Sequence, residues 1–307
     1  MGRPSGIGPV PLMTRFDIFS GWLAFACLVS MATLNMTPAA ASADSGLAYI
    51  HLNEVMDAYE SVASNELRFL ESYKIILPQK PEKSLEDVAY AYDNALVMLC
   101  YIYQNTDDGR RRARILADSF VYVLNHDRYY QDGRLRNAYS ARNLIHKDTG
   151  KAILPGFWNP ETRQWQEDKE QVSTHTGNLA WAAIALSQFY VAQGGEAYKA
   201  AALAIGNWIY DHAFSDEGGY TGGYAGWEPH AEKLLWKSTE HNLDVYALFL
   251  WLHKITGDRK WEERALHAKK FVDAMWAGDH FWSGTTPESG VIDKDHPALD
   301  VQAWSVL

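Results

Sequence analysis

A weak internal repeat constrains the fold of this chain more than any other feature of its sequence. Four segments, residues 92–95, 176–180, 240–244 and 298–302, place polar or acidic residues at the start of apolar runs. They recur at spacings of roughly 85, 64 and 56 residues, which is typical of one supersecondary unit used several times. Asp93, Asp244 and Asp300 fall at similar points in these segments. Carboxylates at like ends of like helices predict a shared polar site.

Each repeat predicts a pair of helices with different surroundings. The first helix of a pair is apolar nearly all round, as in residues 245–252, and such a helix is buried on most sides. The second is amphipathic: Trp261, Ala265 and Ala268 recur at helical spacing, with charged residues such as Glu262 on the other side. Buried inner helices that alternate with amphipathic outer helices predict an all-α fold, an (α/α) toroid of helical hairpins.

Turn and cap residues predict where the helices begin and end. Ser84 is a suitable N-cap, and Glu86 and Asp87 favour the positive N-terminal end of the helix that would follow. Pro297 is well suited to a first helical turn. The expected helices cover residues 47–73, 84–103, 110–124, 174–192, 196–212, 239–255 and 259–276, and a last one begins after Pro297.

Long loops follow the first, second and third outer helices. Residues 129–165, 216–236 and 278–296 are rich in glycine, aromatic and polar residues. Loops of this length in a compact domain are usually functional. Because each loop leads into an inner helix, we expect the loops to cover the end of the ring at which the inner helices start.

The first 43 residues predict a secretory signal peptide. Arg3 and Arg15 precede an apolar stretch at 18–36, and Ala-Ser-Ala at 41–43 is a small-x-small cleavage signal. We therefore expect a toroid domain at 44–307 and a secreted or periplasmic protein; an uncleaved anchor is the alternative. After residue 43 no stretch is long and apolar enough to span a membrane, so no membrane contact is expected after cleavage.

The composition of the chain excludes some partners. Lys and Arg number 28 against 38 Asp and Glu, so the net charge is −10 and nucleic acid is not expected to bind. The one basic run, Arg110 to Arg112, is expected to lie on a solvated surface at the start of a helix. Cys100 lies in an apolar helix and is expected in the core. The sequence leaves the oligomeric state open.

The chain ends at Leu307, about three turns into the fourth inner helix. That helix has no outer partner in the sequence. We therefore expect the toroid to be truncated at its C-terminus, or to be completed by another segment or subunit.

Residues 84–307 resemble the six-hairpin glycosidase superfamily, the (α/α)6-toroid carbohydrate enzymes, without pointing to a specific family. The resemblance is carried by the four inner-helix starts and by the loop residues 216–224 and 281–285. It implies roughly three and a half of six hairpins. It also implies a carbohydrate substrate bound in a cleft at the N-terminal end of the inner helices. Many members are inverting hydrolases, while related toroids include sugar epimerases and polysaccharide lyases.

Two carboxylates in the third repeat predict acid–base chemistry. Glycoside hydrolysis needs one carboxylic acid to protonate the leaving oxygen and a second carboxylate to activate water or attack carbon. Glu240 and Asp244 are four residues apart and so share a helix face. We expect Glu240 to be the proton donor, Asp93 or Asp244 to be the base, and Asp300 to bind substrate. Alternatively, these residues only favour the helix N-terminus or bond one hairpin to another.

Histidines stand at matching places in two inner-helix starts. A pair such as His175 and His241 would suit an epimerase, and His241 with a Tyr or Asn would suit a lyase. Alternatively, each is a polar cap or a wall residue. We assign both histidines, with Asn178 and Asn242, to substrate binding. Neither histidine belongs to a metal-binding pattern, so no metal or other cofactor is expected.

Aromatic residues support a carbohydrate ligand. The chain has 12 tryptophans, and an aromatic face buries the C–H face of a sugar while its hydroxyls stay hydrogen-bonded. Trp227 and Trp282 are the favoured binding residues because glycines flank them. Alternatively, the loop tryptophans anchor long loops on the ring. The loop group comprises Trp158, Trp165, Trp227, Trp236 and Trp282.

The sequence therefore predicts a glycoside hydrolase that acts on a poly- or oligosaccharide through carboxylates. The first alternative is a toroid sugar epimerase or polysaccharide lyase that uses His175 and His241. The second alternative is a toroid that binds carbohydrate without catalysis.

Overall fold

Three helical hairpins and the start of a fourth form the framework of the described part of the chain. The computed structural model describes residues 43–59, 64–74, 83–287 and 290–306, so almost all of the predicted signal peptide lies outside the described residues. The hairpins are α3 (Ala91–Gln104) with α4 (Asp107–Asn125), α6 (Thr176–Gln193) with α7 (Glu196–Ala213), and α8 (Thr239–Thr256) with α9 (Arg259–Ala274). Helix α10 (Leu299–Trp304) begins the fourth.

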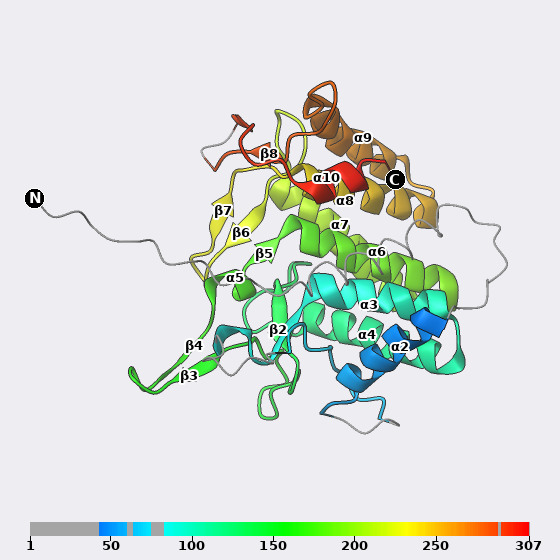
Figure 1. Cartoon of the computed structure of the whole chain (residues 1–307), viewed down its shortest axis with the longest axis vertical. Helices are drawn as coiled ribbons and strands as arrows, with labels where there is room; N and C mark the ends of the chain where they lie inside the picture. Colours follow the sequence, from blue (N-terminus) through cyan, green and yellow to red (C-terminus); the bar gives the residue numbers. More distant parts are fainter. Residues whose placement is uncertain (1–42, 60–63, 75–82, 288–289, 307) are drawn as a thin grey trace, which may run out of the picture.

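The hairpins form two layers. Inner helices α3, α6, α8 and α10 contact one another in that order, and α4, α7 and α9 each pack against their own inner partner. Figure 1 shows the inner helices side by side along the long axis of the molecule. The predicted all-α toroid of hairpins is confirmed. Helix α2 (Ala43–Met56) packs beside α3, where the Tyr49 hydroxyl donates to the Cys100 carbonyl at 3.0 Å.

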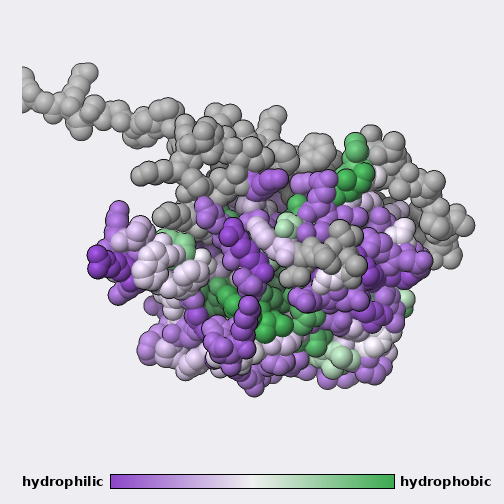
Figure 2. Space-filling model, turned by 90° about the horizontal axis from the view of Figure 1, so that it is seen from below, coloured by the Kyte–Doolittle hydropathy of each residue, from purple (hydrophilic) through white to green (hydrophobic). Residues whose placement is uncertain are grey.

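Burial explains the two kinds of helix. Every residue from 179 to 189 on α6 is buried, as its predominantly apolar sequence predicts. On α9, Trp261, Ala265 and Ala268 are buried while Glu262 is exposed, so only one face enters the core. On the face seen in Figure 2, hydrophilic residues surround a hydrophobic area near the middle.

Short antiparallel strands, which the helix pattern did not predict, lie in the long loops and directly before α3 and α6. Figure 1 places them at the end of the molecule where the inner helices begin, so the loops cover that end as expected. Strand β1 directly precedes α3, and β5 directly precedes α6. The pairs are β1 (Val88–Tyr90) with β2 (Ala138–Ser140), β3 (Phe157–Asn159) with β4 (Gln164–Gln166), β5 (Thr174–His175) with β6 (Gly223–Ala225), β6 with β7 (Glu232–Leu234), and β8 (Gly284–Thr285) with β9 (Ile292–Asp293).

The predicted helix at 47–73 is wrong beyond residue 56. Helix α2 ends at Met56, and residues 64–74 are not helical. The buried Arg68 folds back on the end of α2, where its Nε donates to the Met56 carbonyl at 2.9 Å and its Nη2 to Asp57 at 3.3 Å. This contact satisfies a helix-end carbonyl and holds the following chain in an extended form.

The predicted N-cap at Ser84 is also wrong. Residues Lys83–Leu85 form a short 3-10 turn, β1 follows, and α3 begins only at Ala91. Asp87 has a left-handed backbone with a φ of 59°. Its carboxylate accepts hydrogen bonds from the Ser140 hydroxyl at 2.8 Å and from the Arg142 N–H at 2.6 Å. These long-range bonds favour pairing of β1 with β2 over an earlier helix start.

An amide side chain joins the start of three inner helices to the loop before it. These amides are Asn94 in α3, Asn242 in α8 and Gln302 in α10, each four residues after the N-cap. The Asn242 Oδ1 accepts from the Tyr220 N–H at 2.7 Å, and its Nδ2 donates to the carbonyls of Tyr220 at 3.0 Å and Ser238 at 2.8 Å. Asn94 and Gln302 make the corresponding three bonds. We call this arrangement the amide clasp.

We predict that Asn242→Ala lowers the free energy of unfolding by about 1–3 kcal/mol, because it leaves a buried N–H and buried carbonyls without a partner. Asn94→Ala should have a similar effect. Urea unfolding followed by tryptophan fluorescence measures both. The control is Asn125→Ala, since Asn125 is exposed and bonded only within its own helix. Its effect should stay within about 0.5 kcal/mol. Equal effects of all three changes would contradict the structural role of the clasp.

Candidate active site

Acidic side chains from three inner helices lie near one another at the helix starts. Burial first, and then the charges of Asp244, Glu240, Asp93 and Asp300, raise the pKa of Tyr92. The Tyr92 phenol therefore lies within electrostatic reach of carboxylates on α3, α8 and α10. We call Asp93, Glu240, Asp244 and Asp300 the carboxylate cluster. The structure brings together all four acidic residues singled out from the sequence.

Glu240 and Asp300 form a carboxyl pair within this cluster. Each lies two residues after its N-cap, Glu240 on α8 and Asp300 on the adjacent α10. Glu240 is half-buried, whereas Asp300 is exposed. Burial, the charge of Asp300 and hydrogen-bond contact with Asp300 raise the pKa of Glu240 to about 7. Glu240 therefore holds its proton up to neutral pH.

Asp244 lies at the buried side of the cluster. Its side chain is 5% exposed, and burial followed by the charges of Glu240 and Asp300 raises its pKa well above the ordinary value. The indole N–H of Trp181 lowers the pKa of Asp244, although it does not meet the geometry of a hydrogen bond. Trp181 packs against Tyr92 at 5.8 Å and Trp304 at 5.4 Å between ring centroids. Packed aromatic side chains thus lie beside the buried end of the carboxylate cluster. The sequence pattern did not single them out.

His175 and His241 lie on the same end of the molecule but not at matching helix positions. His175 is the N-cap of α6, whereas His241 lies three residues after the N-cap Ser238 of α8. The ring centroids of the two histidines are 6.4 Å apart, and Trp236 contacts them at 6.0 Å and 5.5 Å respectively. The matching positions expected from the sequence are wrong because a strand residue, not a helical one, supplies His175.

Burial keeps both histidines neutral. It lowers the pKa of His175 to about 4, and burial with the neighbouring His175 lowers that of His241 to about 3. The His175 Nδ1 faces a Glu170 carboxylate oxygen at 3.2 Å. The His241 Nδ1 is buried without a hydrogen-bond partner. At neutral pH neither ring is an imidazolium.

Two glycines make room for these rings. A Cβ at Gly177 would lie 2.4 Å from the His241 Cδ2, and one at Gly222 would lie 2.6 Å from the Trp236 Cζ2. Both distances are shorter than contacts that side chains tolerate. Gly177 in the sequence Thr-Gly-Asn at 176–178 indicates such a close approach at a helix start. The sequence alone does not show which ring packs against this glycine.

The asparagines predicted to bind substrate contact the protein instead. Asn242 is wholly buried, and its amide is used by the clasp described above. The half-buried Asn178 donates to the Asn137 Oδ1 at 2.9 Å, and the same oxygen accepts from the His175 N–H at 2.8 Å. Asn137 is wholly buried in a loop without periodicity, so sequence reasoning missed it.

The two favoured tryptophans lie in different loops, and the Thr239 hydroxyl, one residue before Glu240, donates to the Trp282 carbonyl at 2.6 Å. Trp227, 48% exposed, follows β6 in the loop that leads to β7. Trp282 packs against His280 at 4.3 Å between ring centroids, and the Lys294 ammonium lies 6.0 Å from its ring. Among the loop tryptophans, Trp236 is the one that contacts the predicted site histidines.

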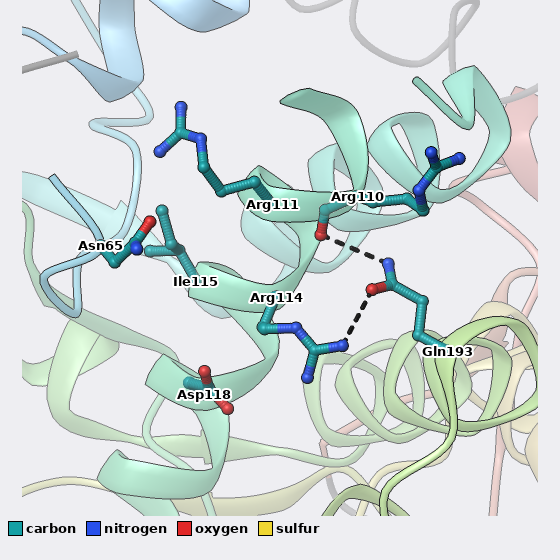
Figure 3. Close-up of a pocket in the computed structure, with 7 residues that line it drawn as sticks. All are labelled: Asn65, Arg110, Arg111, Arg114, Ile115, Asp118 and Gln193. Atoms are coloured by element: carbon teal, nitrogen blue, oxygen red, sulfur yellow. Dashed lines mark hydrogen bonds between the residues drawn. The ribbon is translucent and has the colours of Figure 1, made fainter. Parts of the chain in front are cut away.

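A separate cavity of about 490 Å³ lies at the other end of the inner helices, where α3 and α6 finish (Figure 3). Gln193 donates to the Arg110 carbonyl at 3.3 Å and accepts from Arg114 at 3.1 Å. The expectation of a solvated basic run is wrong for Arg112, which is 2% exposed and bonded to Asp57 at 2.7 Å. These arginines join α4 to its neighbours.

Among the described residues no three His, Cys, Asp or Glu side chains are placed to hold a metal ion. No helix within the described ranges is long and apolar enough to cross a membrane.

Comparison with solved structures identifies the fold. An unsaturated glucuronyl hydrolase from Bacillus sp. GL1 aligns with 94% of this chain and 74% of its own, with a TM-score of 0.56 and 15% identity. A sugar epimerase from a ruminal bacterium aligns with 79% of this chain and 57% of its own, with a TM-score of 0.53 and 15% identity. The chain has the six-hairpin glycosidase fold. It spans little more than half the length of the epimerase.

The fold alone does not distinguish hydrolysis from epimerisation, because the names of the two proteins state different reactions. No protein-family model and no curated protein matches the sequence. The choice of reaction therefore depends on the residues of the site.

We predict that Glu240→Gln stabilises the protein more at high pH than at low pH. The pKa of Glu240 in the folded chain, about 7, lies above its ordinary 4.5. The stability contributed by its protonated form is therefore fully present below 4.5 and lost as the pH rises through 7. Urea unfolding at about pH 9 and about pH 4 measures the difference. The exposed Glu263→Gln on α9 is the control. If Glu240→Gln raises the free energy of unfolding only at low pH, the result would contradict the raised pKa of Glu240.

Proposed function

We propose that this protein is a carbohydrate-active enzyme that hydrolyses glycosidic bonds, with Glu240 as the proton donor. The observation that supports this is the carboxyl pair of Glu240 and Asp300 at the starts of two neighbouring inner helices. Glycoside hydrolysis requires one carboxyl group that is protonated at the working pH and another that is ionised. Burial and a neighbouring carboxylate are the means by which proteins keep such a proton in place.

Asp93 suits the role of base better than Asp244 does. Asp244 is almost wholly buried, so it has little contact with water, and its raised pKa makes it hold a proton more tightly than an ordinary carboxyl group does. Asp93 is half-buried on α3, and both Asp93 and Glu240 act on the Tyr92 phenol. A sugar bound beside Tyr92 would therefore be close to both the acid and the base. Asp300 would keep the proton on Glu240 and bind the substrate.

The charges of the site favour a neutral sugar. The largest charge effects on Tyr92, Glu240 and Asp244 all come from carboxylates. A uronic acid bound there would meet like charges at short range, which is unfavourable. We therefore propose a neutral poly- or oligosaccharide as the substrate. The signal-peptide pattern of residues 1–43 supports a secreted or periplasmic location, where such polymers are met.

A sugar epimerase is the second candidate because His175 and His241 face each other at 6.4 Å. A reaction with two histidines needs one as base and the other as acid. With pKa values of about 4 and 3, both are neutral bases at pH 7. The acid is then missing from the histidine pair, whereas Glu240 can supply a proton. This difference favours hydrolysis.

The test is turnover of a panel of neutral and acidic polysaccharides by the full chain. Reducing ends and the ultraviolet absorbance of unsaturated products are read together. We predict reducing ends without that absorbance, and kcat/KM that falls as the pH rises through about 7, because Glu240 must be protonated. Glu240→Gln and Asp93→Asn should each lower kcat by about 10²–10⁴-fold. Asp244→Asn should have a smaller effect.

Matched variants separate the candidates. Glu263→Gln is the control for Glu240→Gln, since Glu263 is exposed on the outer helix α9. Activity that survives Glu240→Gln but is lost in His241→Asn would overturn the hydrolase proposal and support the epimerase. New ultraviolet absorbance would point to a lyase.

A further inference from the structure

Two tryptophans outside the carboxylate cluster form an exposed pair on a hairpin. Trp158 on β3 lies directly opposite Trp165 on β4, so both side chains are on the same face of the ribbon. The two residues are 55% and 56% exposed. Figure 1 shows the hairpin extending away from the helices. These indoles do not anchor the loop on the ring, which was the alternative role expected for them.

The face that carries the pair is hollowed. A cavity of about 310 Å³ lies there, near the lower end of the range of small-molecule sites, which is about 300–1,000 Å³. Its polar groups are the carboxylates of Glu86 and Asp87 and the guanidinium of Arg142. Arg142 is 51% exposed in its side chain and 3.9 Å from Asp87. The lining comprises Glu86, Asp87, Arg142, Gly156, Phe157, Trp158 and Trp165.

The backbone sets the orientation of one indole. A Cβ at Gly156 would lie 2.5 Å from the Trp165 Nε1 and 2.7 Å from its Cε2. The pyrrole side of Trp165 therefore rests directly on the Gly156 backbone. The other end of β4 is tied down as well, because Arg128 donates to both oxygens of Glu167 at 2.6 Å and 2.8 Å. The β3–β4 hairpin is therefore anchored at Trp165 and at the residue that follows β4.

The hollow and the carboxylate cluster lie at the same end of the molecule. Glu86 and Asp87 directly precede β1, which leads into α3 and so to Asp93. From Trp165 the chain passes through β4 and α5 (Lys169–Val172) to His175. The two places share no residue, so a ligand that reaches both must be longer than a single ring.

We propose that this hollow, the tryptophan platform, binds a sugar ring of the same neutral polysaccharide chain whose bond is cut at Glu240. The proposal rests on the proposed function for the identity of that chain. Paired indole faces cover the C–H faces of the ring, while carboxylate and guanidinium groups bond its hydroxyls. Opposite charges side by side favour an uncharged polar ligand over a lipid surface. The substrate is therefore a polymer or a long oligosaccharide, not a monosaccharide.

The test is affinity electrophoresis of the full chain in native gels. The gels contain galactomannan, xyloglucan, mixed-linkage β-glucan, dextran or yeast α-mannan. At least one should retard the wild type, and the double variant Trp158→Ala, Trp165→Ala should raise Kd for it by about tenfold. Gly156→Ala, which keeps both indoles but displaces Trp165, should also weaken binding, whereas Trp158→Phe, Trp165→Phe should restore most of it. Trp276→Ala is the control, since Trp276 is 50% exposed and outside the hollow.

The outcomes separate this proposal from the proposed function. The Glu240→Gln variant should be retarded in the gels as much as the wild type, because the platform does not use Glu240. If that variant is retarded and also keeps its full turnover, the hydrolase mechanism alone is overturned. Equal retardation of the wild type and the double alanine variant would overturn the platform alone. Retardation by none of the polysaccharides would also overturn the platform. Sedimentation with phosphatidylcholine–phosphatidylglycerol vesicles that depends on the two tryptophans would overturn it as well.

Discussion

The site depends on how the start of each inner helix is bonded to the loop before it. Asn94, Asn242 and Gln302 each join a loop peptide and a helix-start carbonyl four residues after the N-cap. On α8 and α10 the position two residues after the N-cap carries Glu240 and Asp300, whereas on α3 Asp93 lies three residues after the N-cap. The clasp thus fixes the loop beside the helix turn that carries these acidic residues.

Gathering carboxylates in this way works against stability. Burial and like charges raise the pKa values of Glu240 and Asp244, so these groups bind protons more tightly in the folded chain than in the unfolded chain. Proteins keep such unfavourable arrangements where function requires them. The histidines show the opposite effect of the same burial, since they lose their protons. The acid of the site is therefore a carboxyl group and not an imidazolium.

Apolar periodicity predicted the parts of the fold that local sequence controls. Inner and outer helices, and the meeting of Asp93, Glu240 and Asp300 at one end, follow from it because like helix starts pack side by side. Periodicity failed where long-range hydrogen bonds decide the backbone. Arg68 ends α2 early, and Asp87 delays α3 until Ala91. It also could not show which loop tryptophan reaches the histidines, since loop conformation depends on contacts far apart in the sequence.

The most direct measurement is a titration of the Glu240 side-chain carboxyl by carbon NMR, with the signal assigned through Glu240→Gln. A raised pKa that depends on burial and on Asp300 predicts a midpoint near 7, and a lower midpoint in Asp300→Asn, where the neighbouring charge is removed. A midpoint near the ordinary 4.5 in the wild type, unchanged in Asp300→Asn, would contradict a proton-holding carboxyl pair and the acid catalysis built on it.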